Sequence, residues 1–161
     1  MAVTLDIART WRAPRDVMRD MLAMGPREDR AIAYLLVGCL LIFVAQWPRL
    51  SRIAFLDGVE FDRLVAYEFV SWMIVWPLIF YAIAALLHGL MLLFRQPSRM
   101  WSARIVLFWS VLATSPVGLL YGLASGLIGV SPGTQLVGAI WLGALVLFVA
   151  QGLREARGLH G

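Results

Sequence analysis

The sequence has no lysine, a single cysteine and few charged residues of any kind. Charged side chains make up 15% of its 161 residues, and all 14 basic residues are arginine. The lone Cys39 excludes an intramolecular disulfide and a cysteine-rich metal site. In place of charge, the chain is 61% hydrophobic, which is more apolar surface than a soluble domain of this length can bury. The composition therefore predicts a membrane protein.

The few charges also indicate what the chain contacts. The net charge is +4 in a chain with so little total charge. This balance is better suited to anionic lipid headgroups than to the groove of a nucleic acid. We therefore expect membrane lipids as partners and no nucleic acid.

Three long segments without Asp, Glu, Lys or Arg predict the membrane spans. They are residues 31–48, 69–94 and 105–153. The first two each fit one crossing of a hydrocarbon core of about 30 Å, whereas the third is long enough for two crossings and a turn. The predicted fold is all-α, a bundle of four transmembrane helices. Their predicted ranges are 30–47, 67–94, 104–129 and 134–153.

The stretch "TSPVGLLYGLASG" decides where the third segment turns. A break at Pro116 would leave a first helix of about 15 Å, too short to cross. We therefore place the turn at residues 131–133 and predict that Pro116 bends a single helix. The hydroxyls of Thr114 and Ser115 can then satisfy the carbonyls that the proline frees.

Two further prolines carry predictions. Pro48 follows the interfacial Trp47 and is expected to end the first helix. Pro77 lies in a segment longer than a vertical crossing needs, so a kink is expected there.

The arginines predict the orientation. Six lie in residues 1–30, three in 95–104 and two in 154–161, against three in 48–66 and none in 130–134. The positive-inside rule then places both termini in the cytoplasm of a multi-pass protein of the bacterial inner membrane. The expected organisation is a cytoplasmic segment 1–28, a membrane domain 29–153 and a short tail 154–161.

The segment "APRDVMRDMLAMG" predicts a short amphipathic helix before the first span. Val17, Met18, Met21 and Leu22 form its apolar side. This helix can lie in the headgroup plane or on the cytoplasmic face of the protein itself, and the pattern fits both. From this helix and the connection "RQPSRMWSAR", the residues predicted to contact the membrane surface are Arg15, Arg19, Met18, Met21, Leu22, Arg95, Arg99 and Trp101.

Small residues at four-residue spacing predict a helix-packing interface. Gly118, Gly122 and Gly126 share one side of the third span, and Ala139 and Gly143 repeat the spacing on the fourth. Because such residues let backbones approach closely in a membrane, we expect spans three and four to cross here. The sequence leaves open whether a different protein also docks on them.

Two ionisable groups are candidates for an intramembrane polar site. His88 lies within the second span and Glu68 begins it. A hydrogen bond from His88 to a neighbouring helix is the alternative to a functional role. Haem ligation would need a second histidine within a span, and no metal-ligand cluster or nucleotide-binding motif is present in the sequence. We expect no cofactor, no metal and no catalytic residues, and therefore no enzyme.

Several segments together resemble bacterial Yip1-family membrane proteins. They are "TWRAPRDVMRDML", "REDRAIAYLLVGCLLIFVAQWPRL", the "TSP" of the third span and "IWLGALVLFVAQGLREARGL". The resemblance implies a cytoplasmic N-terminus and five spans, the last of which would follow "GLREARGL". Here the chain ends at Gly161, so the resemblance implies a four-span version. It implies no catalytic residue.

These observations lead to three functional hypotheses. The first is an accessory or scaffold subunit that associates with a larger membrane complex, respiratory or photosynthetic, or with further copies of itself. The second is a small transporter or channel subunit that uses His88 and Glu68. The third is a membrane-organising protein that acts through its amphipathic N-terminal helix.

Overall fold

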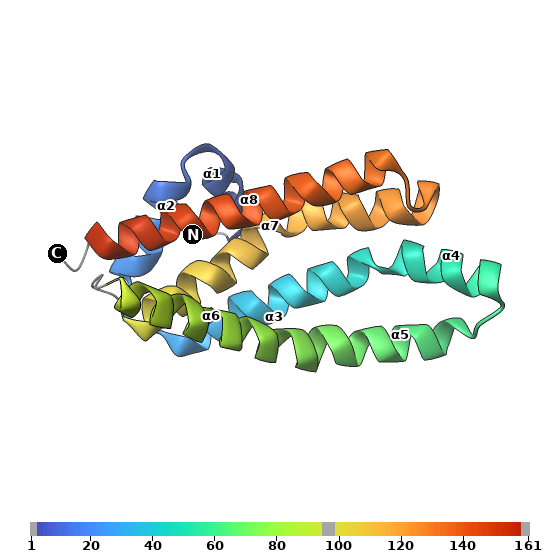
Figure 1. The fold of residues 1–161 in the computed structure, drawn as a ribbon, viewed down its shortest axis with the longest axis horizontal. Coiled ribbons are helices and arrows are strands. Elements are labelled where there is room, and N and C mark those ends of the chain that lie inside the picture. The colour runs from blue at the N-terminus through green and yellow to red at the C-terminus, as the bar shows by residue number, and fades with distance from the viewer. Residues whose placement is uncertain (1–2, 95–98, 159–161) are drawn as a thin grey trace.

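The computed structural model describes residues 3–94 and 99–158, and these residues form an all-α bundle (Figure 1). The prediction of an all-α fold with four membrane-length helices is confirmed. The elements in chain order are α1 (Val3–Arg12), α2 (Pro14–Ala23), α3 (Glu28–Ala45), α4 (Trp47–Asp57), α5 (Phe61–Val70), the π-helix η1 (Ser71–Val75), α6 (Trp76–Leu93), α7 (Met100–Ile128) and α8 (Pro132–Gly158).

Each of the four membrane-length spans is longer than its predicted range. They run over Glu28–Asp57, Phe61–Leu93, Met100–Ile128 and Pro132–Gly158. The first span continues as helix α4 beyond Pro48, so the expectation that Pro48 ends the helix is wrong. The helix breaks two residues earlier, at Gln46, and Pro48 occupies the first turn of α4, where a proline needs no backbone donor. Only residues 58–60 separate α4 from α5.

α7 is the central helix of the bundle. In the most apolar 18-residue stretch of α7, 72% of the residues are buried. In the corresponding stretches of the second and fourth spans only 17% are buried. Phe108, Trp109 and Ala113 of α7 are fully buried. The other three spans and both N-terminal helices contact α7. The outer sides of α6 and α8 are correspondingly exposed.

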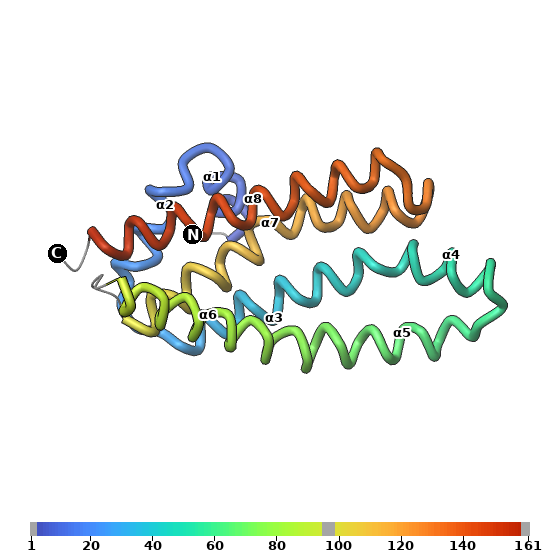
Figure 2. The backbone as a smooth tube through the Cα atoms, viewed as in Figure 1, coloured from blue at the N-terminus to red at the C-terminus, as the bar shows by residue number. Residues whose placement is uncertain are grey.

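Pro116 lies inside α7, and the helix continues past it to Ile128. α7 changes direction along its length (Figure 2). A proline in a helix leaves the carbonyl four residues earlier without its backbone donor. Here the Ser115 hydroxyl donates to that carbonyl, on Leu112, at 2.8 Å. The Thr114 hydroxyl donates to the Ser110 carbonyl at 2.9 Å. The chain turns between α7 and α8 at residues 129–131, and α8 begins at Pro132.

Pro77 is accommodated in a different way. The five residues before α6 form the π-helical segment η1, whose wider turn precedes the proline in the first turn of α6. The backbone N–H of Trp76 donates to the Ser71 carbonyl, five residues back, as the π-helix requires. The helical path of the second span therefore continues past Pro77.

The glycine side of α7 packs mainly on the first span, which corrects the expected crossing with the fourth. A Cβ on Gly122 would overlap the Ala45 carbonyl, and one on Gly126 would lie 2.6 Å from the Pro48 carbonyl carbon. Gly118 does face α8, with a Cβ position 3.2 Å from the Trp141 ring. Sequence spacing shows that a close approach occurs but does not identify the approaching helix.

Ala139 and Gly143 are not part of this interface. Both are exposed, and the space beside Gly143 is open to at least 4 Å. α8 instead approaches α7 through Gly138, beside Tyr121, and Gly152, beside Val106. The helix also continues to Gly158, so residues 154–158 of the expected tail extend α8.

Candidate functional site

The N-terminal helices dock against the bend of α7. The Trp109 indole N–H donates to the Thr10 hydroxyl at 3.1 Å, and both residues are fully buried. The Trp11 indole N–H donates to the Ala113 carbonyl at 3.0 Å, just before Pro116 in α7. The Trp11 ring also meets the Phe148 ring of α8 edge to face. α1 therefore contributes to the hydrogen bonding of a proline-bent helix.

α2 places its apolar side on the bundle. Val17, Met18, Met21 and Leu22 are all buried, with Met18 only 1% exposed. Met18, Met21 and Leu22 are therefore not at the lipid-facing surface of the structure, because they are buried where α2 packs on α7 and α8. Of the two placements that the sequence left open, the structure has the helix on the protein itself.

The arginines predicted to contact the membrane surface do not share one environment in the structure. Arg15 is exposed, and Arg99 is exposed at the N-terminus of α7. Arg19 donates to Glu155 of α8 at 3.0 Å, an interaction that raises the pKa of Arg19. This ion pair joins α2 to the C-terminal part of α8. Arg95 lies outside the described residues.

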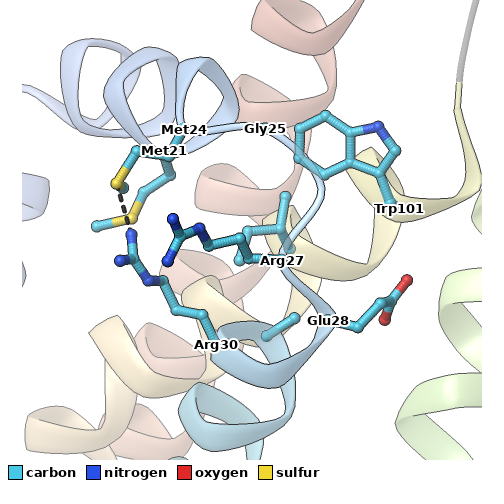
Figure 3. Close-up of a pocket in the computed structure, with 9 residues that line it drawn as sticks. Met21, Met24, Gly25, Arg27, Glu28, Arg30 and Trp101 are labelled. Atoms are coloured by element: carbon cyan, nitrogen blue, oxygen red, sulfur yellow. Dashed lines mark hydrogen bonds between the residues drawn. The ribbon is translucent and has the colours of Figure 1, made fainter.

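A small cavity lies where the α2–α3 connection meets the start of α7 (Figure 3). Its volume is about 10 Å³, room for about one water molecule. Trp101 lines it from α7 and is half-buried. The Arg30 side chain extends toward Met24 and contacts its sulfur (Figure 3). The volume is too small for an organic ligand.

A second, open cavity of about 630 Å³ lies between α1, α2 and α3. This is within the size range of small-molecule and cofactor sites. The residues that line it are Val3, Asp6, Arg9, Val17, Asp20, Met21, Ala23, Met24, Arg30 and Tyr34. It combines apolar and thioether surface with two carboxylates, two guanidiniums and a phenol.

The two members of the predicted intramembrane polar site lie far apart. Glu68 accepts a hydrogen bond from Arg49 at 2.8 Å, and Arg49 also donates to Gln46 at 2.9 Å. His88 is half-buried near the other end of the same span and is engaged in an interaction of its own. His88 lies 20 residues after Glu68 in the sequence, about 30 Å along the helix. The two side chains do not form one site.

The Arg49–Glu68 pair is expected to couple the first two spans weakly. Arg49 is 40% exposed and Glu68 22%, so the interaction is partly screened. In a double-mutant cycle with Arg49→Gln and Glu68→Gln, we expect a coupling energy of about 1 kcal/mol. Denaturation in mixed micelles measures it. The control is the cycle of Arg49→Gln with Asp57→Asn, in which the two changes in unfolding free energy should simply add. If the changes also add in the Arg49 and Glu68 cycle, the ion pair does not contribute to stability and the prediction is contradicted.

Sequence reasoning missed α1, the Thr10–Trp109 contact and the Arg49–Glu68 pair. The spacing of Ile7 and Trp11 would have been the signal for an apolar side on α1. The Arg49–Glu68 pair had no local signal, because its members lie on different helices.

The four membrane-length helices make this chain a multi-pass α-helical membrane protein. No protein-family model, curated protein or solved structure matches it. Within the described residues, no group of three His, Cys, Asp or Glu side chains could hold a metal ion.

Proposed function

We propose that this chain is a non-enzymatic accessory or scaffold subunit of the bacterial inner membrane. It would dock the outer side of α8 against a helix of a larger membrane complex, respiratory or photosynthetic, or of a second copy. Both termini would lie in the cytoplasm, as the arginine distribution indicates. The relationship to bacterial Yip1-family proteins stays a prediction.

The exposed small residues of α8 are the observation that carries this proposal. At other glycines, such as Gly122 and Gly152, the space beside the residue is already occupied by backbone or side-chain atoms of a neighbouring helix. Ala139 and Gly143 form a pair at the same four-residue spacing, yet they face outward with open space at Gly143. In lipid, where apolar surface alone gives no drive for association, small residues allow the close contact that holds helices together.

The two other hypotheses have weaker support. A transport role needs polar groups along one pathway, and Glu68 and His88 lie at opposite ends of their span. A membrane-organising role needs the apolar side of α2 in lipid, and that side is buried in the bundle.

Filling the outer side of α8 should release the partner. We expect Gly143→Leu to lower the amount of co-purifying membrane protein about tenfold, because loss of close packing removes about 1–2 kcal/mol of association energy. The measurement is a pull-down of the tagged chain from native membranes in mild detergent, with quantitation of the proteins recovered.

Gly89→Leu on α6 is the matched control, since the space beside Gly89 is also open to at least 4 Å. It should leave recovery unchanged. Purification of the unaltered chain alone at native abundance would contradict the proposal, as would full recovery of the partner with both Gly143→Leu and Ala139→Leu.

A further inference from the structure

The open cavity between α1, α2 and α3 lies at a definite level along the bundle. Arg30 is the last charged residue before the charge-free segment 31–48, and it lines the cavity. Tyr34, also in the lining, lies one helical turn further, about 6 Å deeper. In a membrane this is the level where lipid headgroups meet acyl chains.

Two donors in the lining have weak acceptors. Among the described residues, the Arg30 guanidinium contacts the Met24 sulfur, and the Tyr34 hydroxyl lies 3.7 Å from the Met21 sulfur. A thioether is a poor hydrogen-bond acceptor. A phosphate oxygen would be a much stronger one, because its hydrogen bonds to a guanidinium are charge-assisted.

The carboxylates in the lining have spare acceptor capacity. Arg9 reaches both Asp6 and Asp20 at 3.4 Å, a long distance for a charge-assisted hydrogen bond. Asp6 is mostly buried, whereas the Asp20 side chain is 56% exposed. An ionised carboxylate offers about four acceptor positions, so both can accept further donors.

The lining is therefore balanced in charge, with two guanidiniums and two carboxylates. A ligand with only negative charge would face repulsion from the carboxylates. A zwitterion with a phosphate and a primary ammonium would match both signs. Met24 and Val3, which are 44% and 40% exposed, add apolar surface for the glycerol backbone and the first carbons of the acyl chains.

We propose that this cavity binds the headgroup of an aminophospholipid, the phosphoethanolamine type. Arg30 and Tyr34 hold its phosphate, and Asp20, supported by Asp6, accepts hydrogen bonds from its ammonium. The bound lipid lies against α1, α2 and α3, and its site stands independently of the accessory role proposed above.

Native mass spectrometry of the detergent-solubilised, delipidated chain tests the site. The chain is titrated with phosphatidylethanolamine, phosphatidylcholine and phosphatidylglycerol of identical acyl chains. We expect phosphatidylethanolamine to bind about tenfold more tightly than either of the others. The choline headgroup lacks N–H donors and the glycerol headgroup lacks a cation, so each loses the charge-assisted bonds to the carboxylates. Equal affinities would overturn the proposal, and a preference for phosphatidylglycerol would show an anion site instead.

Variants test which residues bind the phosphate and which bind the ammonium of the headgroup. Arg30→Gln should weaken phosphatidylethanolamine binding about tenfold, and Asp20→Asn should abolish the preference over phosphatidylcholine. Arg157→Gln, an exposed arginine of α8, is the matched control and should change neither value. If Arg30→Gln unfolds, Tyr34→Phe tests the phosphate half. Affinities unchanged in Asp20→Asn and in the folded phosphate-half variant would overturn the assignment.

A soluble competitor separates the lipid from a free metabolite with the same chemistry. Glycerophosphoethanolamine, which lacks acyl chains, should displace the lipid only in excess of at least about a hundredfold, because it loses the apolar contacts. Displacement at equal concentrations would overturn the assignment to a lipid and indicate a soluble phosphoethanolamine ester.

Discussion

Gly122→Ala is expected to separate the first and third spans and to lower the free energy of unfolding by at least about 2 kcal/mol. The added Cβ would overlap the Ala45 carbonyl oxygen and would lie 2.6 Å from its carbon. Both are backbone atoms of α3, so no side-chain rotation can relieve the clash. The helix axes must move apart, and the packing around them is lost. Denaturation of the purified chain in mixed micelles measures the change.

Gly143→Ala is the control for this experiment. It makes the same chemical change on α8, where the nearest surroundings are empty to at least 4 Å. We expect its free energy of unfolding to match the unaltered chain or to rise slightly, since alanine is the better helix former. If both variants had equal stability, the close approach of α3 and α7 at Gly122 would be wrong.

Trp109→Ala is expected to have the largest effect among side-chain truncations. Trp109 is fully buried, contacts the Tyr34 ring edge to face and donates to Thr10. Removing a buried tryptophan costs about 3–5 kcal/mol, from lost apolar contact and the cavity left behind. Because Thr10 then loses its bond to α7, the N-terminal helices should also loosen.

Two measurements check this prediction. Denaturation in mixed micelles gives the loss of stability, and limited proteolysis gives the rate of cleavage within residues 3–23, which should increase. Trp47→Ala is the control, because Trp47 is 46% exposed and lies outside the core. An intact N-terminal segment in Trp109→Ala would contradict the role of Trp109 in holding α1.

The number of spans and the path of the third span could be predicted because a helix must be long enough to cross the hydrocarbon core, which allows few ways to divide the apolar segments. Each crossing needs about 20 residues without charge, and Pro116 lay too near the start of its segment to be a turn. The bend at Pro116 needed only the rule that a proline removes one backbone donor, with Ser115 beside it to donate instead.

The parts that could not be predicted depend on contacts between distant segments. A proline after an apolar run is compatible with the end of a helix or with the first turn of the next, and Pro48 is the second kind. The small-residue spacing of α7 did not specify that Ala45 of α3 would be the neighbour. α1 is a short, charged helix held by its bonds to Trp109 and Ala113, about 100 residues later in the chain.

The most direct test of this account is a cross-link between α2 and the end of α8 in native membranes. Arg19 and Glu155 are partly exposed and joined at 3.0 Å, so Arg19→Cys with Glu155→Cys should react with a short bifunctional thiol reagent. Cys39 is fully buried and is replaced by alanine to remove background. Arg19→Cys with Val130→Cys, at the opposite end of the bundle, should not react within one chain. Efficient cross-linking of 19 to 155 alone is the predicted result; its absence, or equal cross-linking of 19 to 130, would contradict the docking of the N-terminal helices on the bundle.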